Sequence, residues 1–451
     1  MVALRRIDCS TSDAREALAA LRRQLSLGGE VVSDRSRDLT RAVFGEPLTP
    51  RQAVEHICRA VAERGLPAVQ HFSRFLDKFD LRAENLRVTA EELAAAHVAA
   101  RPGLLPLVRR VRQQLLAFQL GILHQDAVLR RGQHELGLRY RPLRRVGIHV
   151  PGGAAAYPST LLMTAVPAQA AGVAELAVVA PPTPFGSNNP DLLAVCQELG
   201  IREVYRVGGA QAIAALAYGI EGLPRVDMIV GPGNLFVALA KRHVYGQVGI
   251  DMVAGPSEVI VLADDSARPD FLAADLIAQA EHAPGASFLI TWHAPLLEAV
   301  AAEIEAQLAR LSRGDLARAS LEQFGALILA PSEHAAVELT NDFAPEHLHI
   351  QTRAASLHAE RIDRAGAIFI GPYSPVAVGD YLAGPSHVLP TGGTARFASG
   401  LSANDFLRRQ SVIRFDAAAL QQVGPDVMAL AELESLPGHA ASVRCRLESL
   451  P

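Results

Sequence analysis

Short apolar runs alternate with segments of helical periodicity from about residue 145 onward. The first runs predict buried strands, separated by helices, at 146–150, 176–180, 203–207 and 226–230. Later runs predict strands at 259–263, 287–291, 326–329, 347–351 and 367–370. Strands that alternate with helices at this spacing form βαβ units and parallel sheets, whose ligands bind beyond the carboxyl ends of the strands. The pattern predicts an α/β fold with two Rossmann-like parallel-sheet domains.

The two ends of the chain have a helical pattern instead. Ala53, Ile57 and Val61 recur on one helix face, and a peripheral helix is expected at 12–25. Near the C-terminus, helices are expected at 402–414 and 418–446. We therefore divide the chain into an N-terminal helical arm, a discontinuous first α/β domain, a second Rossmann-like domain and a C-terminal helical tail. These parts are residues 1–45, 46–148 together with 259–400, 149–258 and 401–451, respectively.

The composition limits the classes of function. The chain has 451 residues, of which 49% are hydrophobic and 20% charged, as in a globular protein. Its formal net charge of −4 argues against nucleic acid or an anionic membrane as a partner. The four cysteines form no CxxC pair, and the first ten residues lack the apolar run of a signal peptide. A cytoplasmic protein is expected.

Acid–base and metal-binding side chains gather at the ends of predicted elements, where such groups indicate a site. In chain order they are Gln279 with His282, Glu346 with His347, Asp380 with His387, and Glu434 with His439. The first pair shares one face of a predicted helix, and the second opens a predicted strand. The third lies in a glycine-rich loop, and the fourth flanks a Pro-Gly turn. Taken singly, each pair is also typical of turn or surface groups.

Taken together, Gln279, His282, Asp380 and His439 offer two imidazoles, one carboxylate and one amide oxygen. With Zn²⁺ this set has a formal charge of about +1, so the metal stays a good Lewis acid and accepts a substrate nitrogen or oxygen.

Two glycine turns stand between a predicted strand and a helix N-terminus. They are Gly208-Gly209-Ala210-Gln211 and Gly231-Pro232-Gly233-Asn234. Backbone N–H groups and the helix dipole at such places suit a phosphate. Neither turn is a GxGxxG motif, so a turn that needs a positive φ explains them as well. Ser257 follows Gly255-Pro256 without the second glycine of a nucleophile elbow, and we interpret it as a polar substrate contact.

These segments, in this order, resemble the histidinol dehydrogenase family from about residue 50 to the C-terminus. The similar stretches are 146–153, 208–219, 227–241, 251–264, 279–285, 344–348, 379–391 and 392–406. The resemblance implies zinc-dependent, NAD-linked oxidation of L-histidinol through L-histidinal to L-histidine, the last step of histidine biosynthesis. It also implies a homodimer in which the C-terminal tail of one subunit completes the site of the other.

The resemblance further implies roles for individual residues. His347 is the base that takes the hydroxyl proton, and Glu346 is the base that activates water onto the aldehyde. The implied zinc ligands are Gln279, His282, Asp380 and His439. The implied substrate contacts are Ser257, Gln279, His282, His347, Asp380, His387, Glu434 and His439. Gln211 and Asn234 are implied to contact NAD in the second domain, while the first domain holds most of the metal-binding and catalytic residues.

The chain departs from the family pattern at His149, where a tyrosine is usual beside the cofactor, and at Val376, which is often glutamate. Two other activities agree with the same residues. One is the same oxidation of another small polar amino alcohol or diol. The other is a zinc hydrolase in which Glu346 activates water without a nucleotide. A non-catalytic, partner-binding relative would be expected to lose Glu346, His347 or a metal ligand, and this chain keeps them.

Overall fold

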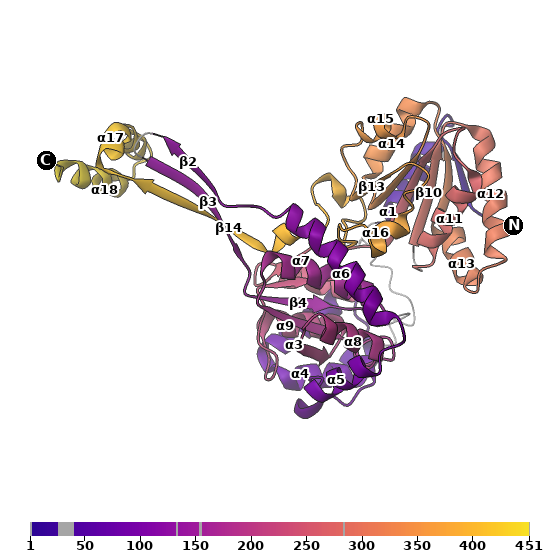
Figure 1. Ribbon diagram of the computed structural model, residues 1–451, viewed down its shortest axis with the longest axis horizontal. Helices are drawn as coiled ribbons and strands as arrows, with labels where there is room; N and C mark the ends of the chain where they lie inside the picture. Colours follow the sequence, from indigo (N-terminus) through magenta and orange to yellow (C-terminus); the bar gives the residue numbers. More distant parts are fainter. Residues whose placement is uncertain (1, 26–39, 132–133, 153–155, 283–284, 451) are drawn as a thin grey trace.

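The computed structural model describes residues 2–25, 40–131, 134–152, 156–282 and 285–450. Within these ranges, two parallel sheets with helices on both faces form the body of the molecule, and a long arm projects from it (Figure 1). The predicted α/β class with two parallel-sheet units is confirmed. No helix in the same ranges is both long enough and apolar enough to cross a membrane.

The first sheet has the strand order β1-β11-β10-β9-β12-β13, and all neighbouring strands are parallel. Its strands are β1 (Arg5–Asp8), β9 (Ser257–Ala263), β10 (Gly285–Thr291), β11 (Gly325–Leu329), β12 (His347–Gln351) and β13 (Ala367–Ile370). Its helices are α1 (Ala14–Leu25), α11 (Pro269–Ala280), α12 (Ala294–Leu308), α13 (Gly314–Phe324), α14 (Glu333–Phe343), α15 (Ala355–Ala359) and α16 (Val376–Tyr381).

Alternate residues of β9 enter opposite cores, as the two-residue period of a strand requires. Val259 and Val261 pack with α11 and α12, whereas Ile260 and Leu262 pack with α1 and α14. Because both faces are covered, the strand is a continuous apolar run, which is why the sequence predicts it so directly.

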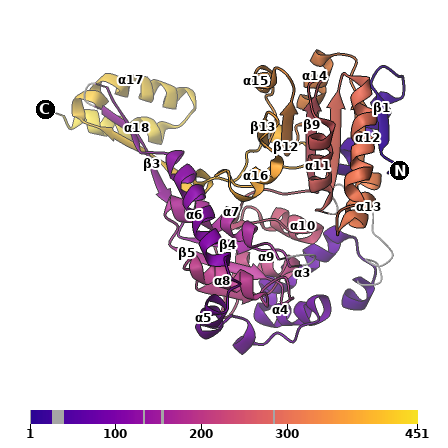
Figure 2. The ribbon, with the colours of Figure 1, turned by 45° about the vertical axis from the view of Figure 1, so that its right-hand side comes forward.

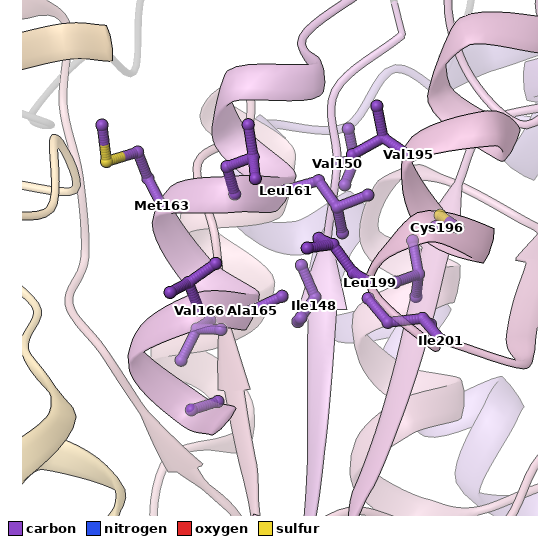
Figure 3. Packing of buried hydrophobic residues seen from close by; sticks show 14 of the residues in the cluster. Ile148, Val150, Leu161, Met163, Ala165, Val166, Val195, Cys196, Leu199 and Ile201 are labelled. Atoms are coloured by element: carbon purple, nitrogen blue, oxygen red, sulfur yellow. The ribbon is translucent and has the colours of Figure 1, made fainter. Parts of the chain in front are cut away.

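The second sheet has the strand order β6-β5-β4-β7-β8 and is also parallel. Its strands are β4 (Arg145–His149), β5 (Glu175–Ala180), β6 (Glu203–Arg206), β7 (Met228–Val230) and β8 (Gly249–Ile250). The helices between them are α7 (Pro158–Ala171), α8 (Pro190–Glu198), α9 (Gly209–Tyr218) and α10 (Leu235–Val244). Figure 3 shows Ile148 and Val150 packed between Leu161 of α7 and Leu199 beside α8.

The helices of residues 46–148 cover the second sheet, so their assignment to the first domain was wrong. These elements are α3 (Pro50–Arg64), α4 (Leu66–Phe72), η1 (Ser73–Asp77), η2 (Ala83–Asn85), α5 (Ala90–Val98) and α6 (Leu104–Gly121). Val54 and Ile57 of α3 share a core with Val179 of β5, and Leu115 of α6 shares one with Ile148 of β4. The apolar face of an amphipathic helix predicts that the helix packs on a sheet, but it does not predict on which sheet.

The boundary expected at residue 400 is also wrong. The chain that follows α16 crosses onto the second unit well before that point. The Gln119 side chain of α6 donates to the Gly384 carbonyl (3.0 Å) and accepts from the Ala403 N–H (2.8 Å). Val388 and Phe406 enter the core between α6, α7 and the second sheet. Two short helices, η3 (Thr394–Arg396) and η4 (Ala403–Phe406), lie along this crossing segment.

The N-terminal residues are not only a helical arm. The predicted helix is confirmed as α1, but β1 precedes it and pairs with β11 in parallel, with Ile7 opposite Ile328. Ile7 and Leu21 are buried in the core of the first sheet. The segment is therefore an edge of that unit, and its four-residue strand is too short to produce a periodic pattern.

The projecting arm combines antiparallel strands with the C-terminal helices (Figure 1). It consists of β2 (Ala127–Arg131), β3 (His134–Pro142), β14 (Leu407–Phe415), α17 (Ala417–Leu433) and α18 (Pro437–Glu448). The helix expected at 418–446 is present as two helices, α17 and α18, but the helix expected at 402–414 is wrong. Residues 407–415 form a strand because they pair with β3 along its whole length, from Leu407 opposite Pro142 to Phe415 opposite His134. A partner so distant in sequence outweighs local helical periodicity.

Candidate active site

The candidate acid–base residues lie at the amino edge of the first sheet. Ser257 is the first residue of β9, and His347 is the first residue of the neighbouring parallel strand β12. Residues 251–256 lead from the end of β8 directly into β9, so this edge adjoins the carboxyl edge of the second sheet (Figure 2). The acid–base residues therefore do not lie beyond the carboxyl ends of their own strands, as the sequence predicted, but beside the carboxyl edge of the second sheet.

Glu346 is held by donors from β9. Its Oε2 accepts hydrogen bonds from the Ser257 hydroxyl (2.6 Å) and from the Glu258 N–H (2.8 Å). Gln279 Nε2 in turn donates to the Ser257 oxygen (2.8 Å). Burial raises the pKa of Glu346, and the neighbouring His347 and the Ser257 hydrogen bond oppose that rise. The result is a buried carboxylate in a fixed orientation, which is what a general base requires.

His347 has its tautomer set by the backbone. Its Nδ1 lies 3.1 Å from the Glu258 carbonyl oxygen, which only accepts, so Nδ1 carries the hydrogen. Nε2 lies 3.7 Å from Asp380 Oδ1 and is a buried atom without a hydrogen-bond partner in the described chain. Burial lowers the pKa of His347, but the Glu346 and Asp380 carboxylates outweigh it and raise the pKa to about 9. The free Nε2 faces the site.

Asp380 lies among three imidazoles. Burial favours its neutral form, but the neighbouring imidazole of His347, together with the charges of His387 and His282, holds the pKa of Asp380 below its ordinary value. His387 donates from Nδ1 to the Asp380 carbonyl oxygen (3.0 Å), and burial lowers the pKa of its imidazole. His282 follows the end of α11 and is exposed. The carboxylate is thus available to a cation.

Of the predicted metal ligands, Gln279, His282 and Asp380 lie near Glu346 and His347. Gln279 belongs to the Ser257–Glu346 hydrogen-bond chain. His282 is close enough for its charge to lower the pKa of Glu346 and of Asp380. Across the described residues, no group of three or more His, Cys, Asp or Glu side chains is arranged to hold a metal. An amide, one imidazole and one carboxylate are a partial zinc set, which fits the metal once a further ligand is supplied.

Glu434 and His439 are not brought to this site within one chain. Both are exposed, at the end of α17 and the start of α18, and these helices form the tip of the projecting arm (Figure 1). The first sheet with Glu346 and His347 lies at the other side of the molecule.

Glu258 is a member of the site that the sequence did not identify. Its carboxylate is fully buried and accepts from the Glu346 N–H (3.1 Å) and the Gly392 N–H (3.0 Å). Burial and the adjacent Glu346 raise the pKa of Glu258 to about 8. The available signal was a glutamate inside the otherwise apolar run of β9, since charged residues are rarely buried unless paired.

On the second sheet, the Gly231 turn is held in place by a buried ion pair, Lys241 with Asp251. Lys241 Nζ donates to the Gly231 carbonyl (3.0 Å), and Asp251 Oδ2 accepts from the Gly231 N–H (2.7 Å). Lys241 and Asp251 also contact each other, with side chains only 3% and 0% exposed. Gly231 has a φ of 107°, and a Cβ there would lie 2.2 Å from the His149 carbonyl oxygen, so only glycine fits. Asn234 caps α10 by accepting from the Phe236 and Val237 N–H groups.

The other two residues discussed for NAD are buried. Gln211 Nε2 donates to Asp77 Oδ2 (3.0 Å), and burial raises the pKa of Asp77 to about 6. His149 Nδ1 lies 2.8 Å from the Pro232 carbonyl oxygen, and burial lowers the pKa of His149 to about 4. His149 ends the central strand β4, next to the Gly231 turn, so it is a neutral group at the carboxyl edge where β4 and β7 meet. Of the Pro-Gly-Gly segment that follows β4, Gly153 lies outside the described residues.

The chain is similar over nearly its whole length to proteins of one family. The profile of the family described as histidinol dehydrogenase matches residues 46–447. The histidinol dehydrogenase of Rhodopirellula baltica is 57% identical over 442 residues, which cover 98% of this chain and 96% of that protein. The histidinol dehydrogenase of a Synechococcus species is 47% identical, with 93% and 96% covered. The crystal structure of histidinol dehydrogenase from Elizabethkingia anophelis has a TM-score of 0.89 at 30% identity and covers 100% of this chain and 99% of its own.

Proposed function

The chain belongs to the histidinol dehydrogenase family, and from that premise we propose how its residues oxidise L-histidinol to L-histidine with NAD. The activity is that of an NAD-dependent oxidoreductase of histidine biosynthesis. The observation that carries the assignment of roles is the arrangement of two bases side by side. His347 offers a bare, buried Nε2, and Glu346 offers a carboxylate held by Ser257.

In the first oxidation, His347 Nε2 accepts the proton of the substrate hydroxyl. Because Nδ1 is committed to the Glu258 carbonyl, Nε2 is the nitrogen that can do so. The imidazole must be neutral beforehand. A cation bound at Asp380 would offset part of the carboxylate charge that raises the pKa of His347 and so would favour the neutral imidazole. NAD, when bound, supplies the hydride acceptor.

In the second oxidation, Glu346 takes a proton from the water that adds to the aldehyde. A second base is needed because His347 already carries the first proton. Glu346 is suited to the task because its orientation is fixed by Ser257 and the Glu258 N–H, and because burial raises its proton affinity above that of a surface glutamate. Ser257 and His387 are proposed to contact the substrate.

Gln279, His282 and Asp380 are proposed to hold one zinc ion per subunit, with His439 of the partner subunit as the fourth protein ligand. The bound zinc would orient the imidazole and amine of the substrate and polarise it. The proposal is supported by the gathering of an amide, an imidazole and a carboxylate beside His347. Gln211 and Asn234 are proposed to contact NAD at the carboxyl edge of the second sheet.

The protein is proposed to act as a homodimer whose arms exchange. Glu434 and His439 are exposed at the tip of the arm, remote from Glu346 of the same chain. The arm also exposes large apolar side chains, among them Ile413 (71% exposed), Leu430 and Leu433 (82% exposed). Clustered exposed apolar groups indicate a protein partner. We propose a second copy of this chain as that partner, because its site lacks Glu434 and His439. The four free cysteines agree with a cytoplasmic location.

The test is to reconstitute the full chain with zinc and count the NADH formed per L-histidinol consumed. We expect one NADH for each oxidation step, and hence two for each histidine formed. Turnover of another small amino alcohol or diol, with none of L-histidinol, would show that the same scaffold serves a different substrate. No NADH from L-histidinol or from any other small amino alcohol or diol would contradict the proposal.

A further inference from the structure

A buried imidazole lies next to the site, on the strand that carries His347. The proposed reaction does not use it. His349 is on β12, two residues after His347, and is fully buried. Its Nδ1 lies 2.7 Å from Asp275 Oδ2 on α11, and its Nε2 lies 2.9 Å from the Gly371 carbonyl oxygen after β13. Gln351 Nε2 donates to the same Asp275 oxygen (3.3 Å). One side chain thus joins three segments.

Both nitrogens of His349 are engaged. The Gly371 carbonyl only accepts, so Nε2 carries a hydrogen. A second hydrogen lies between Nδ1 and Asp275 Oδ2 and makes the hydrogen bond between these two atoms. An apolar side chain would leave the Asp275 carboxylate and the Gly371 carbonyl buried without this partner, which is costly. The His349 imidazole therefore makes hydrogen bonds that an apolar side chain of the same size could not make.

Each of the three joined segments carries a residue of the site. Gln279 lies one turn after Asp275 on α11, on the same helix face. His347 lies on the same strand face as His349, and both rings contact Phe369 of β13. The chain leaving Gly371 becomes α16, which carries Asp380. The spacing of these segments sets the spacing of the site residues.

We propose that His349 is a positioning residue. It fixes α11, β12 and the start of the β13–α16 connection relative to one another, so that Gln279, His347 and Asp380 meet in the geometry that binds zinc and substrate. This inference rests on the proposed function, and it adds a residue that contacts neither metal nor substrate. Residues that orient metal ligands without contacting the metal affect metal affinity strongly.

The test uses graded substitutions of His349 in the full chain. H349L removes both hydrogen bonds. The amide nitrogen of asparagine lies near the place of Nδ1 and that of glutamine near Nε2, so H349N keeps the Asp275 contact and H349Q keeps the Gly371 contact. The matched control is H358L. His358 is another buried histidine of the first unit with two polar partners, Thr352 (2.7 Å) and Glu333 (3.0 Å), near the carboxyl end of β12.

Zinc affinity is measured by competition with a chromophoric chelator, together with kcat and KM at saturating zinc and the Tm of the metal-free protein. We expect H349L to raise the zinc Kd by about 10- to 100-fold and to lower kcat more than it changes KM. H349N and H349Q are expected to lie between H349L and the wild type. H358L is expected to lower the Tm and leave the zinc Kd unchanged.

The inference is overturned if H349L keeps the zinc Kd and kcat within about twofold of the wild type while losing as much Tm as H358L. If H349L does not fold, wild-type zinc affinity in both H349N and H349Q overturns it equally. The proposed function is tested separately by the wild-type protein, whose zinc binding and NADH yield do not depend on the result for His349.

Discussion

At the residue scale, the proposed chemistry depends on two side chains whose orientation is fixed from the backbone. The Glu258 residue fixes both, since its N–H holds the Glu346 carboxylate and its carbonyl holds His347 Nδ1. The sequence identified Glu346 and His347 because two proton carriers open a strand. It did not identify Glu258, because its backbone contacts do not depend on residue type, and the one available signal was a glutamate in an otherwise apolar strand.

Glu346→Gln should separate the two oxidation steps. The amide keeps the size of the side chain but is no base, so water addition to the aldehyde loses its proton acceptor. We expect oxidation of the aldehyde to slow by about 10²- to 10⁴-fold, the usual contribution of a general base, and oxidation of the alcohol to slow less. Rapid-mixing measurement of NADH formation from each substrate checks this.

Glu298→Gln is the control, because Glu298 is 71% exposed and pairs with Arg6 at the surface. It should leave both steps unchanged. An equal loss in both steps for Glu346→Gln would show that Glu346 is not the base for water.

At the element scale, the strength of the sequence pattern decides what can be predicted. The strands β9, β12 and β5 are buried on both faces and were found almost to the residue. The strands β2, β3 and β14 pair along an exposed arm, and their mixture of charged and apolar residues has no strict alternation. Covering helices such as α3 were found, but their sheet was not, because the choice depends on contacts distant in sequence.

The Gly231 turn between β7 and α10 offers a prediction at this scale. Lys241→Met removes one partner of a buried ion pair and leaves Asp251 charged beneath the turn. We expect a loss of about 3–5 kcal/mol in the free energy of unfolding, because an uncompensated buried charge is expensive. Denaturant unfolding measures this loss, and NAD binding should weaken because the turn also loses a hydrogen bond.

Arg268→Met is the matched control, because Arg268 pairs with Asp270 at the surface. It should leave unfolding and NAD binding unchanged. If Lys241→Met and Arg268→Met behave alike, the ion pair does not support the turn.

At the scale of the whole molecule, the proposed site residues are divided between the body and the arm. Glu346, His347 and Asp380 lie at the amino edge of the first sheet, whereas Glu434 and His439 lie on the arm beyond β14 (Figure 1). The sequence grouped all of them into one site through a family resemblance. Nothing in the local pattern of 401–451 indicates how far that segment lies from the other residues of its own chain.

The central claim, that each site combines the body of one subunit with the arm of its partner, is tested most directly by mixing two inactive variants. Glu346→Gln lacks a base in the body, and His439→Ala lacks a ligand on the arm. In a heterodimer, the site that joins the intact body to the intact arm is complete.

The two variants are unfolded together in equal amounts, refolded with zinc and assayed for the L-histidine formed from L-histidinol and NAD, because formation of histidine requires both oxidation steps. Random pairing of two-fold symmetric dimers makes half of them heterodimers with one complete site, so we expect about a quarter of wild-type activity. Each variant refolded alone should remain inactive. If the mixture is no more active than the separate variants although heterodimers form, each site is built from a single chain and the account is wrong.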